Sequence, residues 1–219
     1  MKKILLVSPH FDDAVLSAGQ YMADRPDTEV ATVFGGYPLT PDRVKTPYDI
    51  KCGFDNAEDA VSQRRIENDQ ALALLEATAV DLPFPDSQYE GMGANMVSPS
   101  EITTALQELV DRNNYEIIMA PLGLAHPDHH KVTDAVMRIR TELPIYLWED
   151  LPVRVVEPNL VPPRLEKYGL TLDKLMNPLT TGDKMAKKIR SMLCYKSQVN
   201  TGILDPYLMY VPERFWKVQ

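Results

Sequence analysis

Residues 4–19 of the chain read ILLVSPHFDDAVLSAG, and this stretch decides the fold. The apolar run 4–7 is typical of a short buried strand, and the apolar positions after Asp13 recur with helical spacing. His10, Asp12 and Asp13 therefore fall on a turn between a strand and a helix, which in an open α/β sheet lies at the ligand-binding edge. Because an unpaired buried carboxylate is costly, we expect a divalent cation to pair with these side chains.

Residues 115–130 carry a second motif, which reads YEIIMAPLGLAHPDHH. An apolar run again leads into a turn and then into a pattern with helical spacing. All four histidines of the chain lie in the two motifs, namely His10, His126, His129 and His130. Imidazole and carboxylate groups are typical ligands of a catalytic zinc ion, which takes three protein ligands and leaves one position for water. The two motifs therefore predict one metal site, and we expect His130 to point away from it.

Further apolar runs alternate with helical patterns along the chain. They predict strands at 29–34, 80–84 and 143–148 and helices at 57–78, 98–113 and 183–194. Strands that alternate with helices favour an α/β fold with parallel strands. The length suits a single domain, and the pattern changes after Pro152. We therefore expect residues 1–152 to form the catalytic core and residues 153–219 to form a C-terminal extension packed on it.

Residues 37–56 contain three prolines and little periodicity, which predicts a long connection without an element of its own. Loops of this length are uncommon unless they are functional or mobile. Two interpretations stay open: the segment covers the site, or it is a disordered surface loop.

Composition limits the partners of the protein. The formal charge of −8 and a pI near 5.0 argue against a nucleic-acid partner, and no Lys/Arg run exceeds two residues. The first apolar run is too short for a signal peptide, and no apolar stretch approaches the ~20 residues that span a bilayer. Cys52 and Cys194 are far apart in sequence and do not suggest a thiolate metal site. We therefore expect a soluble cytoplasmic protein with a small-molecule substrate; a homo-oligomer is compatible with the sequence.

Several motifs of the chain together resemble one known family. In chain order they are residues 8–16, Arg64-x-x-Glu67-x-x-x-Ala71-x-x-x-Leu75, Pro121-Leu122-Gly123 followed by His126-x-Asp128-His129, Glu149-Asp150-Leu151-Pro152, Tyr195-x-Ser197-Gln198 and Glu213-Arg214-Phe215-Trp216. With these motifs the chain resembles the bacterial branch of the PIG-L (LmbE-like) family of zinc-dependent N-acetylglucosaminyl deacetylases. The resemblance implies a Rossmann-like, mostly parallel sheet with helices on both faces. It also implies hydrolysis of an N-acyl group on an amino sugar or sugar-like amine.

The resemblance also implies roles for the motif residues. His10, Asp13 and His129 would hold the metal, which would be zinc or, as the alternative, Fe²⁺. Such a metal polarises the amide carbonyl and activates a water molecule.

Next to these ligands, Asp12 would be the general base. His126 would stabilise the oxyanion and protonate the leaving amine, and Asp128 would orient His126. General acid and base groups of this kind typically contribute ~10²–10⁴-fold in rate.

The substrate pocket is less determined by the motifs. Periodicity alone places Arg64 on a solvated helix face, whereas the resemblance makes it a sugar-binding residue, with Arg65 as the alternative. Leu124 stands where mycothiol-type members have a tyrosine, which argues against that substrate type. We expect a soluble N-acylated amino sugar or a related amine rather than a membrane glycolipid.

Two other functions remain open at this stage. The triplet Asp128-His129-His130 also occurs in DHH phosphoesterases, which would bind two metal ions per chain. A catalytically inactive relative could keep the sugar site without the chemistry. Asp12 and His126 speak against it, since neither is needed merely to bind zinc.

Overall fold

The computed structural model describes residues 3–200, 202 and 206–218. Positions 1–2, 201, 203–205 and 219 of the two expected segments lie outside the described residues. A seven-stranded sheet in the order β3-β2-β1-β4-β5-β7-β6 forms the centre of the fold. The strands are β1 (Lys3–Ser8), β2 (Thr28–Thr32), β3 (Thr78–Asp81), β4 (Tyr115–Pro121), β5 (Ile145–Trp148), β6 (Leu175–Met176) and β7 (Phe215–Lys217). Strands β1 to β5 run parallel, and β7 runs antiparallel to both of its neighbours.

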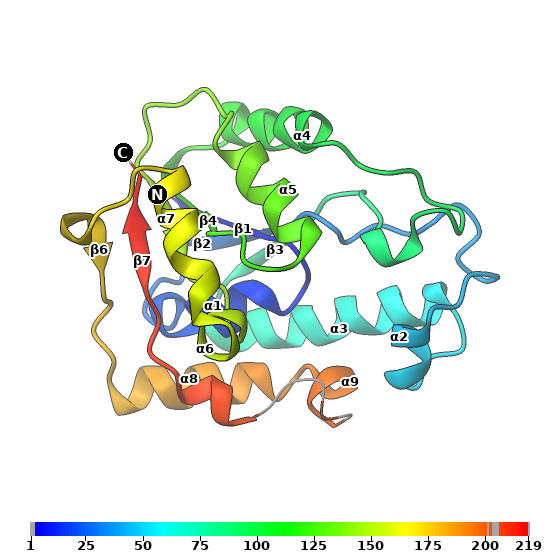
Figure 1. Ribbon diagram of the computed structural model, residues 1–219. Helices are drawn as coiled ribbons and strands as arrows, with labels where there is room; N and C mark the ends of the chain where they lie inside the picture. Colours follow the sequence, from blue (N-terminus) through cyan, green and yellow to red (C-terminus); the bar gives the residue numbers. More distant parts are fainter. Residues whose placement is uncertain (1–2, 201, 203–205, 219) are drawn as a thin grey trace.

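Helices cover both faces of the sheet. They are α1 (Asp13–Met22), α2 (Pro47–Lys51), α3 (Ala57–Leu75), α4 (Pro99–Arg112), α5 (Pro127–Val136), α6 (Val153–Val156), α7 (Val161–Lys167), α8 (Gly182–Met192) and α9 (Lys196–Val199). Figure 1 shows α4 and α5 on one face and α1, α3 and α8 on the other. This single-domain, mostly parallel sheet confirms the predicted fold class. None of the described helices is both long and apolar enough to span a membrane.

Strand β1 lies in the middle of the sheet, and its sequence explains this position. Ile4 and Leu6 pack into the apolar cluster under α1, α3 and α8, whereas Leu5 and Val7 pack into the cluster under α4 and α5. Successive residues of a strand point to opposite faces, so a strand that is buried on both faces needs a continuous apolar run.

The C-terminal segment does more than pack on the core. Its strand β7 pairs with β5, and β6 pairs with β7, so residues after 152 complete one edge of the sheet. Helix α8 packs against α1, where a side chain on Gly19 would come within 2.9 Å of Lys188 Cγ. Gly19 therefore allows this close approach of the two helices.

Two elements differ from the sequence-based expectations. The 37–56 segment contains the short helix α2, whose start is defined by Thr46, since its side chain accepts a hydrogen bond from the Asp49 amide. Strand β3 lies at Thr78–Asp81 rather than at 80–84 because Pro83 cannot donate a ladder hydrogen bond. By contrast, the structure confirms the predicted start of α4 at Ser98, with its complete capping box.

Candidate active site

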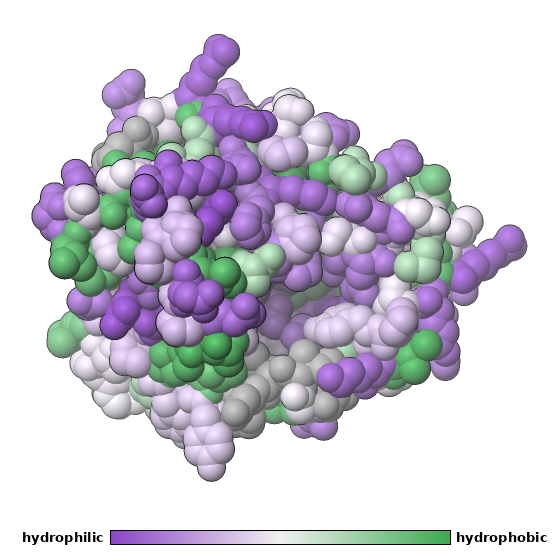
Figure 2. Space-filling view, viewed as in Figure 1, coloured by the Kyte–Doolittle hydropathy of each residue, from purple (hydrophilic) through white to green (hydrophobic). Residues whose placement is uncertain are grey.

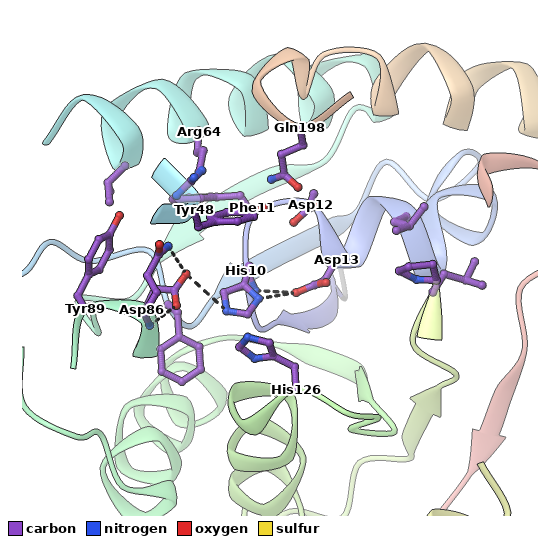
Figure 3. Close-up of a pocket in the computed structure, with 16 residues that line it drawn as sticks. His10, Phe11, Asp12, Asp13, Tyr48, Arg64, Asp86, Tyr89, His126 and Gln198 are labelled. Atoms are coloured by element: carbon purple, nitrogen blue, oxygen red, sulfur yellow. Dashed lines mark hydrogen bonds and ion pairs between the residues drawn. The ribbon is translucent and has the colours of Figure 1, made fainter. Parts of the chain in front are cut away.

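The two histidine motifs meet where the strand order reverses. From β1 the chain continues to β2 and β3 on one side, and from β4 it continues to β5 on the other. Such a switch point opens a crevice at the carboxyl ends of the strands, where open α/β sheets bind ligands. A cavity of about 470 Å³ lies here, lined by both turns. Figure 2 shows the hollowed face, and Figure 3 shows the side chains around the cavity.

Two of the three predicted metal ligands, His10 and His129, approach one oxygen atom of the third, Asp13. Asp13 Oδ2 lies 3.2 Å from His10 Nδ1 and 3.2 Å from His129 Nε2. The same oxygen accepts a hydrogen bond of 2.8 Å from the His10 backbone amide, which fixes the carboxylate at the start of α1. The structure therefore brings together an imidazole from each motif and a carboxylate between them.

The other nitrogen of each ring faces a second carboxylate. His10 Nε2 lies 3.3 Å from Asp128 Oδ2, and His129 Nδ1 lies 2.5 Å from Asp150 Oδ1. Asp150 lies just after the end of β5. The sequence shows acidic residues at this strand end, but it does not reveal the contact of Asp150 with His129. Both imidazoles are thus flanked by carboxylates on two sides.

Electrostatics favour positive charge at this cluster. Burial would lower the pKa of His129, but Asp13 and Asp150 outweigh it and raise the pKa to about 10. Burial likewise opposes protonation of His10, yet Asp86, Asp128 and Asp13 raise its pKa well above the usual value. The pKa of Asp13 is lowered, because the two imidazoles outweigh the effect of its burial.

This donor set fits a divalent cation. The carboxylates stabilise protons on the imidazoles. A bound cation would supply the same positive charge, and metal binding displaces such protons from its ligands. Two imidazole nitrogens and a carboxylate oxygen are ligands typical of catalytic zinc or of iron. Ring nitrogens of His10, His126 and His129 also lie within 4.8 Å of one another, as do potential ligand atoms of His10, Asp86 and Asp128.

Asp12 lies beside this cluster and lines the cavity. It stands at the N-cap of α1, but within the described residues its carboxylate makes no capping hydrogen bond to the helix. Burial, together with Asp13, raises the pKa of Asp12 to about 6. A carboxyl group with this pKa can accept a proton near neutral pH and release it again.

His126 enters the cavity from the opposite side (Figure 3). Its ring centroid lies 5.0 Å from that of His10, and its Nδ1 accepts a hydrogen bond from the Asp128 backbone amide at 3.2 Å. In the neutral ring the proton therefore sits on Nε2. Burial, reinforced by His10 and His129, lowers the pKa of His126. The preceding Ala125 has a left-handed φ of 53°, a strained geometry of the kind found at functional sites.

Asp128 lies differently from its expected position. Its carboxylate accepts from the Ser87 amide at 3.1 Å and faces His10, while its contact with His126 runs through the backbone amide. Lys131 Nζ lies 3.3 Å from the other carboxylate oxygen. The resemblance pairs the Asp128 side chain with His126, whereas in the structure this side chain lies against His10, a predicted metal ligand.

Of the two neighbouring arginines on α3, only Arg64 lines the cavity. Its guanidinium is buried, lies 3.1 Å from Asp49 Oδ1, and stacks near the rings of Tyr48 and Phe54. Arg65 instead pairs with Asp81 at 2.7 Å, outside the cavity. The 37–56 segment forms part of the cavity wall through Tyr48 of α2.

His130 takes no part in the cluster of the other three histidines. Its Nδ1 lies 3.3 Å from Arg164, as part of a network that also binds the Leu122 carbonyl. This position agrees with the expectation that His130 points elsewhere.

Other residues of the cavity were not assigned from the sequence. They include Asp86, Gln88, Tyr89 and Gln198. Asp86 caps the short 3₁₀ helix Ser87–Tyr89, which contains Gln88 and is too short for a periodic pattern. Gln198 belongs to a motif of the resemblance, but its place in the cavity depends on how the C-terminal segment folds back over α3.

The fold and the site define a class: Rossmann-like α/β proteins in which two His/Asp turns meet at a switch point of the sheet. Within this class the chain belongs to the PIG-L family, since the family model described as GlcNAc-PI de-N-acetylase matches residues 5–140, more than half of the chain. No curated protein matches the chain at a significant level.

Solved structures of similar fold include several deacetylases. A zinc-inhibited form of teicoplanin deacetylase Orf2 shares 23% identity over 99% of this chain and 97% of the other, with a TM-score of 0.82. A deacetylase of the teicoplanin biosynthesis pathway shares 25% identity over the same fractions, with a TM-score of 0.83. The N,N'-diacetylchitobiose deacetylase from Pyrococcus horikoshii shares 17% identity over 90% and 70%, with a TM-score of 0.58. The family and these neighbours support an enzyme that performs N-deacetylation.

Proposed function

We propose that the protein is a metal-dependent hydrolase that removes an N-acetyl or other N-acyl group from an amino sugar or a sugar-like amine. One observation carries the proposal: Asp13 Oδ2 lies 3.2 Å from a ring nitrogen of both His10 and His129. Asp12 and His126 line the cavity beside them.

The metal site consists of His10, Asp13 and His129 and holds zinc or, as the alternative, Fe²⁺. When bound, such a cation polarises the amide carbonyl and lowers the pKa of a water molecule towards ~7. The zinc-inhibited form of the teicoplanin deacetylase supports a divalent metal in this class of enzyme.

Two residues of the chain move the protons. Asp12 accepts a proton from the attacking water, and burial prepares it by raising the pKa of its carboxyl group to about 6. His126 stabilises the carbonyl oxygen as it gains negative charge and, once it is protonated at the cost of the hydrogen bond that its Nδ1 accepts, delivers a proton to the departing nitrogen. The C–N bond breaks, and a carboxylic acid and a free amine are formed.

Arg64 binds the sugar part of the substrate. Its Nε atom is buried without a hydrogen-bond partner among the described residues, so a substrate oxygen would satisfy it. The names of the neighbours, a deacetylase–teicoplanin complex and a chitobiose deacetylase, support a sugar-like acylated substrate. We propose a soluble metabolite in the cytoplasm as the substrate, with no nucleic-acid or membrane partner.

Hydrolysis assays with zinc-loaded protein test this function. We expect free amine and carboxylate to be released from N-acylated amino sugars, and no turnover of a phosphodiester. His126→Ala should lower kcat by ~10²–10⁴-fold. Asp42→Asn, which changes an exposed carboxylate outside the cavity, should leave the rate unchanged.

Two outcomes would contradict the proposal. Hydrolysis of the phosphodiester would favour the phosphoesterase alternative. Binding of amino sugars without release of carboxylate, across acyl groups of different length, would favour an inactive relative.

A further inference from the structure

We propose that Asp128 and Asp150 are paired positioning residues, each of which fixes the proton and the orientation of one metal-binding histidine. Asp150 serves His129, and Asp128 serves His10 rather than His126. This inference rests on the proposed metal site.

The contact between Asp150 and His129 is the closer of the two. Asp150 Oδ1 lies 2.5 Å from His129 Nδ1, and Oδ2 accepts a hydrogen bond of 3.0 Å from the Gly123 amide. The carboxylate is 1% exposed, so it has no solvent to turn towards. Gly123 is itself constrained, because its φ is 81° and a Cβ would come within 2.5 Å of Thr133 Oγ1. Asp150 is thus held rigidly against the His129 ring.

Asp128 is placed against His10 in the same way. Its Oδ2 lies 3.3 Å from His10 Nε2 and also accepts from the Ser87 amide at 3.1 Å. The residue is fully buried, and Lys131 contacts its second oxygen. His126 Nδ1 cannot donate to this carboxylate, because that nitrogen already accepts a hydrogen bond from the Asp128 backbone amide.

The two pairs have a common geometric consequence. An imidazole that binds a metal does so through the lone pair of one nitrogen, and the proton on the other nitrogen is fixed by its hydrogen-bond partner. Asp128 holds the proton on Nε2 of His10, and Asp150 holds it on Nδ1 of His129. The free lone pairs, on His10 Nδ1 and His129 Nε2, are the two atoms that lie 3.2 Å from Asp13 Oδ2. Both carboxylates therefore direct the rings to one point.

Zinc affinity of the metal-free protein, measured by competition with a chromophoric chelator, tests this assignment. Outer carboxylates of this kind typically contribute 10–100-fold to metal affinity. We expect Asp150→Asn to weaken zinc binding by ~10–100-fold, since one amide cannot accept from both His129 and Gly123. Asp128→Asn should weaken it by about 10-fold, because its oxygen still accepts but the charge is lost.

Asp111→Asn is the control. Asp111 is an exposed carboxylate on α4, outside the cavity, and accepts a hydrogen bond from Gln107, so zinc affinity should stay within about threefold of wild type. Circular dichroism checks that each variant is folded. In the zinc-loaded wild type, ¹⁵N NMR of the histidine rings should show the proton on Nε2 of His10 and on Nδ1 of His129.

The outcomes separate this inference from the proposed function. If the folded Asp128→Asn variant keeps its zinc affinity and loses only kcat, Asp128 acts on His126 rather than on His10. This result would overturn the assignment. A second zinc ion that Asp86→Asn abolishes would also overturn it, since His10 Nε2 would then be a metal ligand. A folded wild type that binds no zinc would instead defeat the proposed function itself.

Discussion

Two of the regions that bury charged side chains arrange them in opposite ways. At the junction of α1, α8 and the segment before β7, Lys188 Nζ lies 3.0 Å from Glu213 Oε1, and both side chains are fully buried. Glu213 also accepts hydrogen bonds from the Gln20 and Tyr21 amides. At the edge of the cavity, by contrast, Asp12 and Asp13 lie side by side on one turn.

The difference distinguishes buried charges that stabilise the fold from buried charges that serve the active site. At the junction each charge finds its partners within the chain, so the pair attaches the C-terminal segment to the core. At the cavity edge several carboxylates crowd around two imidazoles, and a bound cation would take the place of the imidazole protons that offset their charge. Neutral substitutions should therefore affect activity in one region and stability in the other.

The largest effect on activity is expected from Asp12→Asn. The variant removes the proposed base and should lower kcat/KM by ~10²–10⁴-fold. Its thermal midpoint should not fall, because the substitution relieves repulsion with Asp13. Steady-state kinetics and a thermal melt of the same preparation measure both effects. If the variant were destabilised but still active, Asp12 would serve stability rather than catalysis.

Glu213→Gln should have the opposite effect. It leaves Lys188 buried without a counter-charge, which typically costs about 3–5 kcal/mol in the free energy of unfolding. Urea denaturation measures the loss, and kcat of the folded fraction should stay near wild type. The double variant Lys188→Met/Glu213→Gln should recover part of the stability, and failure to do so would show that the pair itself is not the cause.

A smaller effect on kcat/KM is expected from Arg64, the proposed sugar-binding residue. Arg64→Lys should lower kcat/KM by ~10–100-fold, mainly through KM, as expected for a hydrogen bond from a charged group. Arg65→Lys is its neighbour on α3 and faces Asp81 instead of the cavity, so it should change kcat/KM by less than about twofold. Equal losses in both variants would show that the effect comes from α3 as a whole.

The smallest effect concerns α9, which joins α3 to the cavity. Ser197 donates from its hydroxyl and its amide to the two oxygens of Glu67, and the next residue, Gln198, lines the cavity. Ser197→Ala should cost about 1 kcal/mol of stability and raise KM a few-fold. Unchanged KM would show that Gln198 does not depend on this anchor.

Local signals in the sequence were sufficient for the fold and for the two histidine turns. A strand, a turn with His10 and Asp13, and a helix follow one another within twenty residues, so periodicity alone locates them. The contact between Asp128 and His10 joins residues 118 positions apart, and no local pattern encodes it. The same holds for Asp49, which reaches Arg64 only because the short helix α2 forms in a segment that looks structureless.

The edge of the sheet shows a second limit of sequence-based prediction. Strands β6 and β7 have only two and three residues, too few for a period-2 pattern. Their pairing depends on the return of the chain after α8, which is a tertiary effect. The extension therefore looks like an appendage in the sequence, although it completes the sheet.

Metal content per chain is the most direct test of the metal site proposed at His10, Asp13 and His129. Elemental analysis would compare wild-type protein, purified without chelator, with His129→Ala. We expect one zinc or iron ion per wild-type chain and loss of that ion in the variant. A folded wild type without metal, or with two metal ions per chain, would contradict this proposal.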